Sequence, residues 1–241
     1  MLETIIERGI FGVICEKNTL TAENLSYWLL MIAAVLLCVA AGYFIGSLNA
    51  AIIVSRSKYN SDIRTHGSGN AGMTNMFRTF GKTGGFLTLA GDLAKTALPV
   101  LLGYLFYGYK GSYIAGLFVV IGHCFPIYYK FKGGKGVLAA AVMMLLCDPL
   151  VFLLLIVVFA IILIGTRFVS MSSVVSAMMM PLFIRAVYAW AYGDGASAGI
   201  RIPIAMAITL IIVFMHRANL KRIYNREEPR IKMPWDKKNN G

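Results

Sequence analysis

Long apolar runs constrain this chain more than any other feature of its sequence. They occupy about residues 25–54, 86–107, 112–129, 137–166, 171–190 and 200–215. A run of about 18 or more apolar residues can cross a bilayer as a helix, where every backbone polar group must be satisfied within the segment. Of the 241 residues 58% are apolar and only 14% are charged, which is outside the range of soluble domains. The sequence therefore predicts an all-α integral membrane protein.

The longest run, residues 137–166, is interrupted by Asp148 and Pro149. Proline ends or kinks a helix, so the run forms either one kinked span or two separate spans. With two spans, the first has only the eleven residues 137–147. Such a helix is about 16 Å long against a hydrocarbon core of about 30 Å. It would have to be buried against other helices or begin deeper in the bilayer.

Positive charge decides between these topologies, because cytoplasmic loops carry an excess of Lys and Arg. If the interrupted run forms two spans, seventeen Lys and Arg residues fall on one side of the membrane. They lie in residues 55–85, 130–136, 166–172 and 216–241. A single span would instead place the basic C-terminal segment opposite the basic loop 55–85. We therefore predict seven transmembrane helices, with the N-terminus outside and the C-terminus in the cytoplasm.

The chain divides into three parts. Residues 1–24 mix charge with a short apolar centre and lack the basic start and the cleavage site of a signal peptide, which predicts an interfacial helix. Residues 25–228 contain the seven predicted spans, and residues 229–241 form a basic tail. The four cysteines show no C-x-x-C spacing, so neither a disulfide framework nor a zinc site is indicated. The net charge of +12 is explained by cytoplasmic loops and anionic headgroups, and we expect no nucleic acid.

Residues 62–78, DIRTHGSGNAGMTNMFR, form a glycine-rich and basic segment between two apolar runs. Gly67, Gly69 and Gly72 allow φ > 0, so that backbone N–H groups can converge on an anion as a nest. The segment also supplies short polar side chains and two guanidinium groups that suit phosphate oxygens. These are Ser68, Asn70, Thr74, Asn75, Arg64 and Arg78. Glycine and serine also cluster in ordinary turns, but this density favours a phosphate site. No strand precedes GSGNAG, which excludes a dinucleotide fingerprint.

Three further polar segments fall on the same predicted side. In the loop GGKG, Gly133 and Gly134 free the backbone around Lys135, a compact charge for phosphate. Ser173 lies at a helix start that favours an anion. His123 and His216 lie at helix ends, where a terminal hydrogen bond and a role in the site are equally good interpretations. Their convergence predicts a polar site at the cytoplasmic face.

Asp92 and Lys95 lie one turn apart within an apolar run, where charge is costly unless it faces the bundle or an aqueous pocket. A mutual ion pair is the preferred interpretation and a role in catalysis is the alternative.

Three separated motifs resemble those of the bacterial membrane-bound acyl-phosphate:glycerol-3-phosphate acyltransferases, the PlsY family. GSGNAGMTNMFR resembles the family's GSGNxGATNxxR, with Met73 where alanine is usual. GHCFPIYYKFKGGKGVLA resembles GHxxPxFxxFKGGKGVAT, and HRANLKRIYNREE resembles HRxNIxRLxxGxE, with Arg226 at the glycine position and Glu228 at the acidic one. The resemblance extends from about the first span to Glu228.

The resemblance implies a seven-helix acyltransferase domain over residues 25–228, in the bacterial inner membrane, with its active site facing the cytoplasm. It implies transfer of an acyl group from acyl phosphate to glycerol 3-phosphate, giving 1-acylglycerol 3-phosphate and phosphate. The implied catalytic residues are Ser68, Arg78, Lys135, His123 and His216. The implied phosphate-binding residues are Gly67, Ser68, Gly69, Asn70, Thr74, Asn75, Arg78, Gly133, Gly134, Lys135, Ser173 and Asn219.

The residues themselves agree with this chemistry. None of the three histidines is followed by an aspartate at H-x-x-x-x-D spacing, the dyad that supplies a general base in one large acyltransferase class. An acyl phosphate has a good leaving group, so positioning and charge neutralisation can carry most of the catalysis, with the substrate's own phosphate as base. No metal-ligand cluster is visible and no cofactor is implied. A transporter of a phosphate ester or lysophospholipid is the alternative, disfavoured because no repeats are evident.

Overall fold

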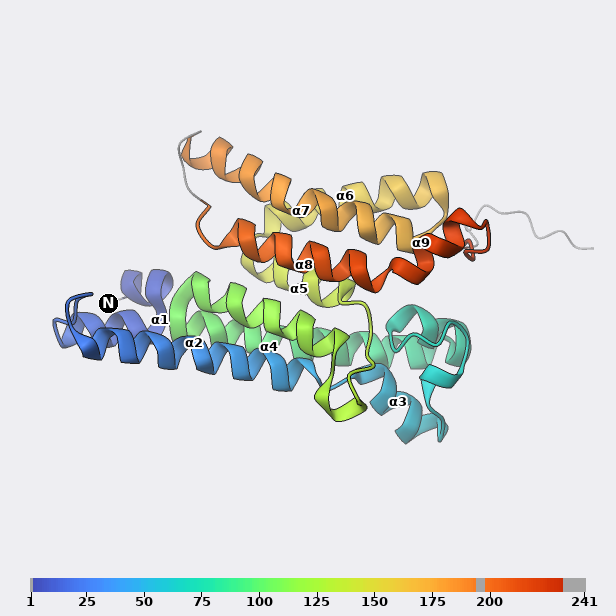
Figure 1. Ribbon diagram of the computed structural model, residues 1–241, viewed down its shortest axis with the longest axis horizontal. Helices are drawn as coiled ribbons and strands as arrows, with labels where there is room; N and C mark the ends of the chain where they lie inside the picture. Colours follow the sequence, from blue (N-terminus) through green and yellow to red (C-terminus); the bar gives the residue numbers. More distant parts are fainter. Residues whose placement is uncertain (1, 194–197, 232–241) are drawn as a thin grey trace, which may run out of the picture.

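The computed structural model describes residues 2–193 and 198–231, and within these ranges all regular structure is helical. The helices are α1 (Leu2–Lys17), α2 (Leu25–Gly46), α3 (Ala50–Tyr59), α4 (Met73–Cys124), α5 (Val137–Cys147), α6 (Pro149–Thr166), α7 (Val169–Tyr192), α8 (Arg201–Met215) and α9 (Arg217–Tyr224). Figure 1 shows two layers, α1 to α4 in one and α5 to α9 in the other. Helix α4 contacts α5 and α8 and so joins the layers.

Four helical segments are long and apolar enough to cross a membrane. They are Leu25–Tyr59, Met73–Tyr129, Pro149–Thr166 and Val169–Tyr192. The pair α8 and α9, bent by 53°, makes a fifth if it is one span, and α5 is a shorter apolar helix of 11 residues. The protein is therefore an all-helical membrane protein with four to five candidate spans by length and composition.

Helix α4 folds back on itself, which reduces the number of spans counted in this way. Its backbone is non-helical at Tyr107 and Gly108, where φ is −138° and 58°. A Cβ atom on Gly103 would overlap the carbonyl oxygen of Gly111, although residues eight apart in a straight helix are separated by about 12 Å. The two limbs of α4 are therefore an antiparallel hairpin, and they contain the apolar runs 86–107 and 112–129.

Two details of the sequence prediction are corrected by the fold. The run 25–54 is not one helix, because α2 ends at Gly46 and α3 begins at Ala50, where the Asn49 side chain accepts the N–H of Ile52. The chain reverses at Tyr107–Gly108 rather than over 108–111. The interruption at Asp148 and Pro149 does separate two helices, with the proline in the first turn of α6, where its missing N–H costs nothing.

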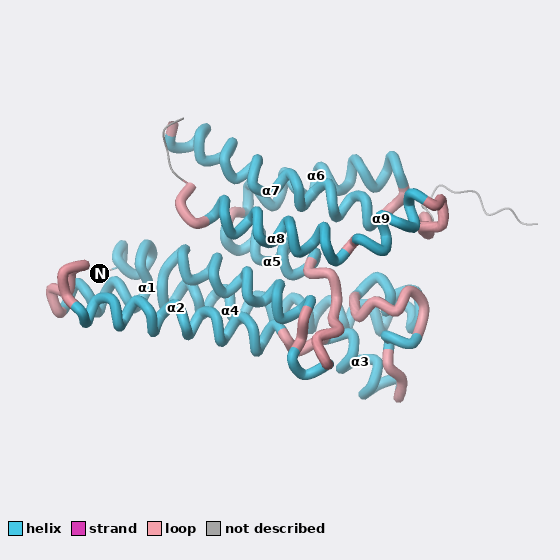
Figure 2. Tube along the Cα trace, in the orientation of Figure 1, coloured by secondary structure: helices cyan, strands magenta, loops and turns pink. Residues whose placement is uncertain are grey.

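The short helix α5 is buried against its neighbours. Met143 and Met144 are fully buried, and they belong to a core shared with the return limb of α4, with α7 and with α8. Val120 from α4 and Ile212 from α8 lie in the same core. Helix α5 lies on the side of its layer that faces α4, as can be followed in Figure 2.

The two ends of the chain pack back onto this bundle. Helix α1 bends at Gly9 (φ 63°), whose backbone lies against Gly108 at the reversal of α4, and Phe11 packs on the Tyr107 ring at 5.0 Å. The predicted N-terminal helix is thus present. At the other end, the Ile231 N–H donates to the carbonyl of Arg167 at 3.0 Å. Residues 232–241 of the predicted basic tail lie outside the described residues.

Candidate active site

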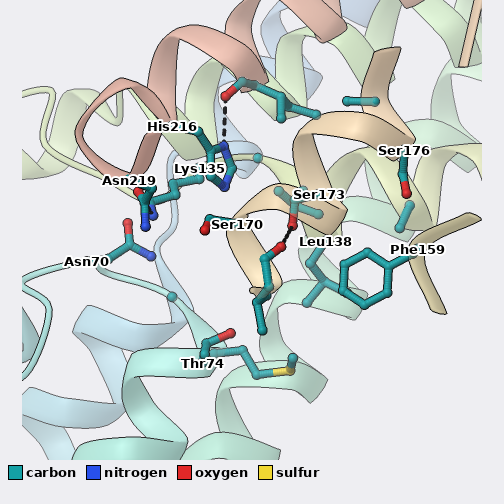
Figure 3. A pocket seen from close by; sticks show the side chains of 18 of the residues that line it. Asn70, Thr74, Lys135, Leu138, Phe159, Ser170, Ser173, Ser176, His216 and Asn219 are labelled. Carbon is teal, nitrogen blue, oxygen red and sulfur yellow. Dashed lines mark hydrogen bonds between the residues drawn. The ribbon is translucent and has the colours of Figure 1, made fainter. Parts of the chain in front are cut away.

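A cavity of about 970 Å³ lies between α4, α5, α6, α7 and the junction of α8 with α9. Polar side chains line one part of it, where Lys135, Asn219 and Asn70 lie together in Figure 3. Apolar side chains of α5, α6 and α7 line the rest. These include Leu138, Met144, Phe152, Leu155, Phe159 and Met180. The cavity thus combines a polar end with a long apolar part.

Most of the residues predicted for the site line this cavity. They are Gly67, Ser68, Asn70, Thr74, Asn75, Arg78, His123, Lys135, Ser173, His216 and Asn219. Four segments far apart in the sequence supply them, as the convergence of the polar segments predicted. Gly69, Gly133, Gly134 and Arg64 are not part of the lining.

The loop 67–72 does not form the predicted nest of free N–H groups. The Ser68 N–H donates to the Asn75 side chain at 3.0 Å, and the Gly69 N–H donates to the His66 carbonyl at 2.9 Å. The Gly72 N–H donates to the Asn70 carbonyl at 3.0 Å. Gly67 and Gly69 do have positive φ, but Gly72 is extended with φ −153°. The N–H groups of Ser68, Gly69 and Gly72 are therefore used within the protein and are not available to a ligand.

Asn75 and Arg64 brace the loop from opposite sides. The Asn75 amide donates to the carbonyls of Ile63, His66 and Asn70, so this side chain is committed to the backbone although it lies in the cavity wall. Arg64 forms a two-pronged ion pair with Asp62 and also donates to the Tyr129 carbonyl at 3.1 Å. Its predicted role as a phosphate ligand is replaced by a link between this loop and residues 127–132.

Two helix N-termini point their unpaired ends toward the polar part of the cavity. Helix α4 begins at Met73 and α7 at Val169, and neither has a side-chain cap. Thr74 and Ser170, in the first turns of these helices, line the cavity. First-turn N–H groups lack intrahelical partners and carry partial positive charge, which favours an anion. The helix ends therefore replace the predicted nest as backbone donors.

Lys135 is held at the polar end by a hydrogen-bonded network. Its Nζ donates to Asn219 Oδ1 at 2.5 Å, and Asn219 Nδ2 donates to Glu228 Oε1 at 2.6 Å. The same carboxylate accepts from Ser170 Oγ at 2.7 Å and from Arg222 Nε at 2.8 Å. Because its first partner is a neutral amide, Lys135 keeps a net charge for a ligand.

Burial and neighbouring charges shift the pKa values of Lys135 and Glu228 in this network. The pKa of Lys135 is lowered to about 8, mainly by burial; Glu228 opposes this shift, and the nearby Arg222 and Arg78 add to it. Burial alone would raise the pKa of Glu228, but the hydrogen bonds from Asn219, Ser170 and Arg222 outweigh it and leave this pKa below its usual range. The exposed Arg78 makes no hydrogen bond or ion pair with the described part of the chain. The cavity end is therefore cationic at neutral pH.

The carboxylate of Glu228 reaches the cavity because α9 ends in a tight cap. The Glu227 N–H donates to the Arg222 carbonyl at 2.7 Å and the Arg226 N–H to the Ile223 carbonyl at 3.0 Å. This is the Schellman pattern, whose residue after the C-cap is left-handed and is usually glycine. Arg226 occupies that position with φ 63°. Glycine adopts this left-handed conformation without strain, which explains why the resembling motif has glycine at this position. Arg226 adopts the same conformation with some strain.

The glycines of the loop 133–136 serve His123 rather than a ligand. The Gly133 N–H donates to the Cys124 carbonyl at 3.2 Å and the Gly134 N–H to the His123 carbonyl at 3.0 Å. A Cβ atom on Gly134 would overlap Nε2 of the His123 ring. Their predicted contact with phosphate is therefore replaced by close packing that aims the next residue, Lys135, into the cavity.

The two cavity histidines make different hydrogen bonds. His216 Nδ1 donates to the Ile212 carbonyl at 2.8 Å, because a carbonyl can only accept. His123 Nδ1 lies 2.8 Å from Nζ of Lys95, whose ammonium can only donate. Lys95 also pairs with Asp92 at 2.9 Å, which confirms the predicted ion pair. His216 thus has both the helix-end hydrogen bond and the place in the cavity that the sequence left open.

Sequence reasoning did not assign Arg222 or Glu228 to this site. Ser170, Arg222 and Glu228 hold the network around Lys135, and Asp92 lines the cavity beside His123. Glu228 had a signal, since it occupies the acidic position of the third motif. The apolar lining had none, because lipid-facing and cavity-facing residues of a membrane helix are equally apolar. In the described part of the chain, no cluster of His, Cys, Asp or Glu is placed to hold a metal ion.

Together the fold and the cavity define a class: an integral membrane protein with a cavity that has a cationic end and an apolar part. Comparison with known proteins narrows this class. The family model described as glycerol-3-phosphate acyltransferase matches residues 36–226. The glycerol-3-phosphate acyltransferase of Bacillus subtilis is 38% identical over 202 residues, which cover 84% of this chain and 99% of the relative. The glycerol-3-phosphate acyltransferase 2 of Bacillus cereus is 39% identical over 201 residues, covering 83% and 96%.

Solved structures agree with this result. The crystal structure of PlsY, an integral membrane glycerol 3-phosphate acyltransferase, in its glycerol 3-phosphate form is similar with a TM-score of 0.72 and 30% identity. The match covers 82% of this chain and 96% of that one. The lysophosphatidic acid form gives a TM-score of 0.71 and 29% identity, covering 82% and 95%. The chain therefore belongs to the glycerol-3-phosphate acyltransferase family, and it is an acyltransferase.

Proposed function

We propose that this protein transfers a fatty acyl group from acyl phosphate to glycerol 3-phosphate, forming 1-acylglycerol 3-phosphate and phosphate. The observation that carries the proposal is the single cavity in which a cationic end adjoins an apolar part. A phosphate group needs the first and a fatty chain needs the second. Relatives named glycerol-3-phosphate acyltransferase and PlsY structures in glycerol 3-phosphate and lysophosphatidic acid forms support the acceptor and the product.

The reaction requires charge neutralisation more than a strong base. The acceptor hydroxyl oxygen attacks the acyl carbonyl carbon, a new ester C–O bond forms, and the C–O bond to the donor phosphate breaks. The hydroxyl proton passes to a phosphate oxygen of glycerol 3-phosphate, and inorganic phosphate leaves. Lys135, Arg78 and the first turns of α4 and α7 are placed to hold the phosphate charges, as electrostatic catalysis demands.

Short polar side chains complete the proposed phosphate contacts. Ser68, Thr74, Asn70, Ser173 and Asn219 line the same end of the cavity. Asn219 already accepts from Lys135 and donates to Glu228, so it orients the lysine whether or not it touches the ligand. The Ser173 hydroxyl donates to the Val169 carbonyl of its own helix, which leaves its oxygen lone pairs to accept.

The proposal includes a topology of seven spans with the site at the cytoplasmic face of the bacterial inner membrane. Its support is the basic composition of the loops around the cavity and the reversal of α4, which turns one long helix into two limbs.

Cysteine labelling tests this topology. Single cysteines in residues 55–85, 130–136 and 220–231 should be labelled from the cytoplasm in a cysteine-free background. A cysteine at Lys110 should be labelled from outside. Outside labelling of residues 220–231 would contradict seven spans. The matching outside loop near Gly195 lies outside the described residues.

The activity is tested by incubating the purified protein with acyl phosphate and glycerol 3-phosphate and following lysophosphatidic acid and released phosphate. Lys135→Met is the inactive control, and acyl-coenzyme A in place of acyl phosphate tests the donor. One-to-one product formation from acyl phosphate supports the proposal. Uptake of glycerol 3-phosphate into proteoliposomes without ester formation would favour the transporter, and equal rates from the thioester would overturn the donor assignment.

A further inference from the structure

Lys95 and Asp92 are charged residues deep inside the first limb of α4, with 6% and 2% exposure. Nζ of Lys95 lies 2.9 Å from Asp92 Oδ1 and 2.8 Å from Nδ1 of His123 on the return limb. Asp92 and His123 line the cavity, whereas Lys95 lies behind them. Buried charge is costly even when paired, and the proposed reaction has no direct use for Lys95. Its contact with His123 indicates what it does.

Lys95 determines which ring nitrogen of His123 carries the proton. An ammonium group has three donors and no lone pair, so Nδ1 must be the acceptor of this hydrogen bond. A neutral imidazole has one proton, which is then on Nε2. Asp92 pairs with Lys95 and lies 3.9 Å from Nδ1, beyond hydrogen-bond distance. His123 is thereby fixed as an Nε2–H donor whose Nε2 cannot accept a proton.

The ring and the backbone of His123 both contact the loop that carries Lys135 and hold it in position. Nε2 lies directly against Gly134, where no Cβ atom would fit. The His123 carbonyl accepts the Gly134 N–H at 3.0 Å. Lys135 follows at once and reaches Asn219. A rotated His123 ring would therefore displace the backbone immediately before Lys135.

We propose that Lys95, held by Asp92, is a positioning residue for acyl transfer. It fixes the tautomer and the orientation of the His123 ring, and through Gly134 it holds Lys135 at the phosphate end of the cavity. The effect on rate rests on the proposed function, whereas the effect on the His123 ring does not.

The kinetic test compares Lys95→Met and Lys95→Arg with wild type. Lys95→Met should lower kcat/KM by roughly 10- to 100-fold, as expected for loss of a charge-assisted contact, with a higher KM for glycerol 3-phosphate. Lys95→Arg keeps a cationic donor and should recover most of that loss. Thr96→Val is the matched control, since Thr96 is fully buried next to Lys95 and its hydroxyl contacts only the Asp92 carbonyl.

A purely structural Lys95 would give a different result. Lys95→Met would then lower the melting temperature, but the folded fraction would keep wild-type kcat and KM, and Lys95→Arg would bring no kinetic recovery. Activity of Lys95→Met within about threefold of wild type, well below the effect of a lost charge-assisted contact, would overturn the proposal.

The tautomer is tested without substrate by ¹⁵N NMR of histidine-labelled protein. The chain has three histidines, and the signals of His123 are those lost in His123→Gln. We expect a protonated Nε2 and an unprotonated Nδ1 in wild type, and a shift toward the other tautomer in Lys95→Met. A protonated Nδ1 in wild type, or no change in Lys95→Met, would overturn the inference. Absence of acyl transfer by wild type would instead overturn the proposed function and leave this measurement intact.

Discussion

Two lysines near the cavity show how one side chain serves opposite purposes. Lys135 follows a glycine loop, lines the cavity and donates to a neutral amide, that of Asn219. Lys95 lies inside a helix limb, does not line the cavity and pairs with the Asp92 carboxylate. The charge of Lys95 is therefore cancelled within the protein, whereas that of Lys135 is available to a substrate.

The difference teaches that the partner of a lysine decides its role more than its burial. A carboxylate partner stabilises an ammonium charge in the protein interior, but the pair then has no net charge to attract a ligand. An amide partner orients the ammonium and leaves its charge uncompensated, so that a phosphate dianion becomes the natural counter-ion. The phosphate end of the cavity is built in this second way, and the cluster Asp92–Lys95–His123 in the first.

The largest expected effect is the loss of charge at the phosphate end. Lys135→Met and Arg78→Ala should each lower kcat/KM by roughly 10- to 150-fold, because a charge-assisted contact contributes about 1.5–3 kcal/mol. Lys135→Arg keeps the charge and should retain more activity than Lys135→Met. The measurement is the initial rate of lysophosphatidic acid formation by protein that elutes as folded material.

Matched controls exist beside both residues. Lys132 lies in the same loop as Lys135, and Lys82 follows Arg78 by four residues, beyond the break of α4 at Gly81. Both are exposed and neither lines the cavity. Lys132→Ala and Lys82→Ala should keep nearly wild-type rates. If Lys135→Met and Arg78→Ala stay within twofold of wild type, these cations do not bind substrate.

Above about pH 8, the dependence of KM on pH should come from Lys135. Burial lowers the pKa of Lys135 to about 8, so the side chain is charged below that pH and loses its proton above it. The KM for glycerol 3-phosphate should rise about fivefold between pH 8 and pH 9, since the charged fraction of Lys135 falls over this range while the substrate phosphate is already a dianion with a second pKa of about 6. In Lys135→Arg the guanidinium stays charged and the rise should disappear. An unchanged alkaline rise in Lys135→Arg would assign it to another group.

Replacing the histidines should have a smaller effect. His216→Gln removes a hydrogen bond worth about 0.5–1.5 kcal/mol, which corresponds to roughly 2- to 12-fold in rate. His123→Gln also removes the contact with Lys95 and should lower the rate about as much as Lys95→Met. Neither should abolish catalysis if the substrate phosphate is the base. Plain glycerol should then be a poor acceptor in kcat as well as KM, because it lacks both the binding group and the base.

Two outcomes would reverse that interpretation. Glycerol with a kcat close to that of glycerol 3-phosphate would exclude substrate-assisted proton transfer. Complete loss of activity in both histidine variants, with the fold intact, would make a histidine the base. His216 would be the stronger candidate, because its Nδ1 donates to Ile212 and leaves Nε2 to accept.

The smallest effect concerns stability at the phosphate end. Arg226 has φ 63°, a conformation that costs a side-chain-bearing residue about 1–2 kcal/mol and glycine little. Arg226→Gly should raise the free energy of unfolding by about 1 kcal/mol without changing KM. Asn225→Gly, at φ −78°, is the control that should not stabilise, and thermal unfolding in detergent measures both. No gain in Arg226→Gly would show that the strain is relieved elsewhere.

The sequence by itself determined the helical membrane architecture, because apolar runs of this length admit few other structures in a bilayer. It also indicated which segments supply the site, because polar, glycine-rich and basic residues concentrate in a few segments between the apolar runs. Lys135 and Arg78 were predicted in this way, whereas Asn219 was implied by the resemblance of the third motif. The ion pair of Asp92 and Lys95 followed from helical spacing alone.

Only the tertiary structure decided how each residue is used. The N–H groups of Ser68, Gly69 and Gly72 donate to acceptors within residues 66–75, and Gly133 and Gly134 pack against His123, because local backbone geometry decides which donors are used. The reversal of α4 at Gly108 brings Lys95 to His123 across 28 positions of sequence. Whether an apolar residue faces lipid or the acyl part of the cavity also depends on packing. Both settings are equally apolar, so composition carries no signal that separates them.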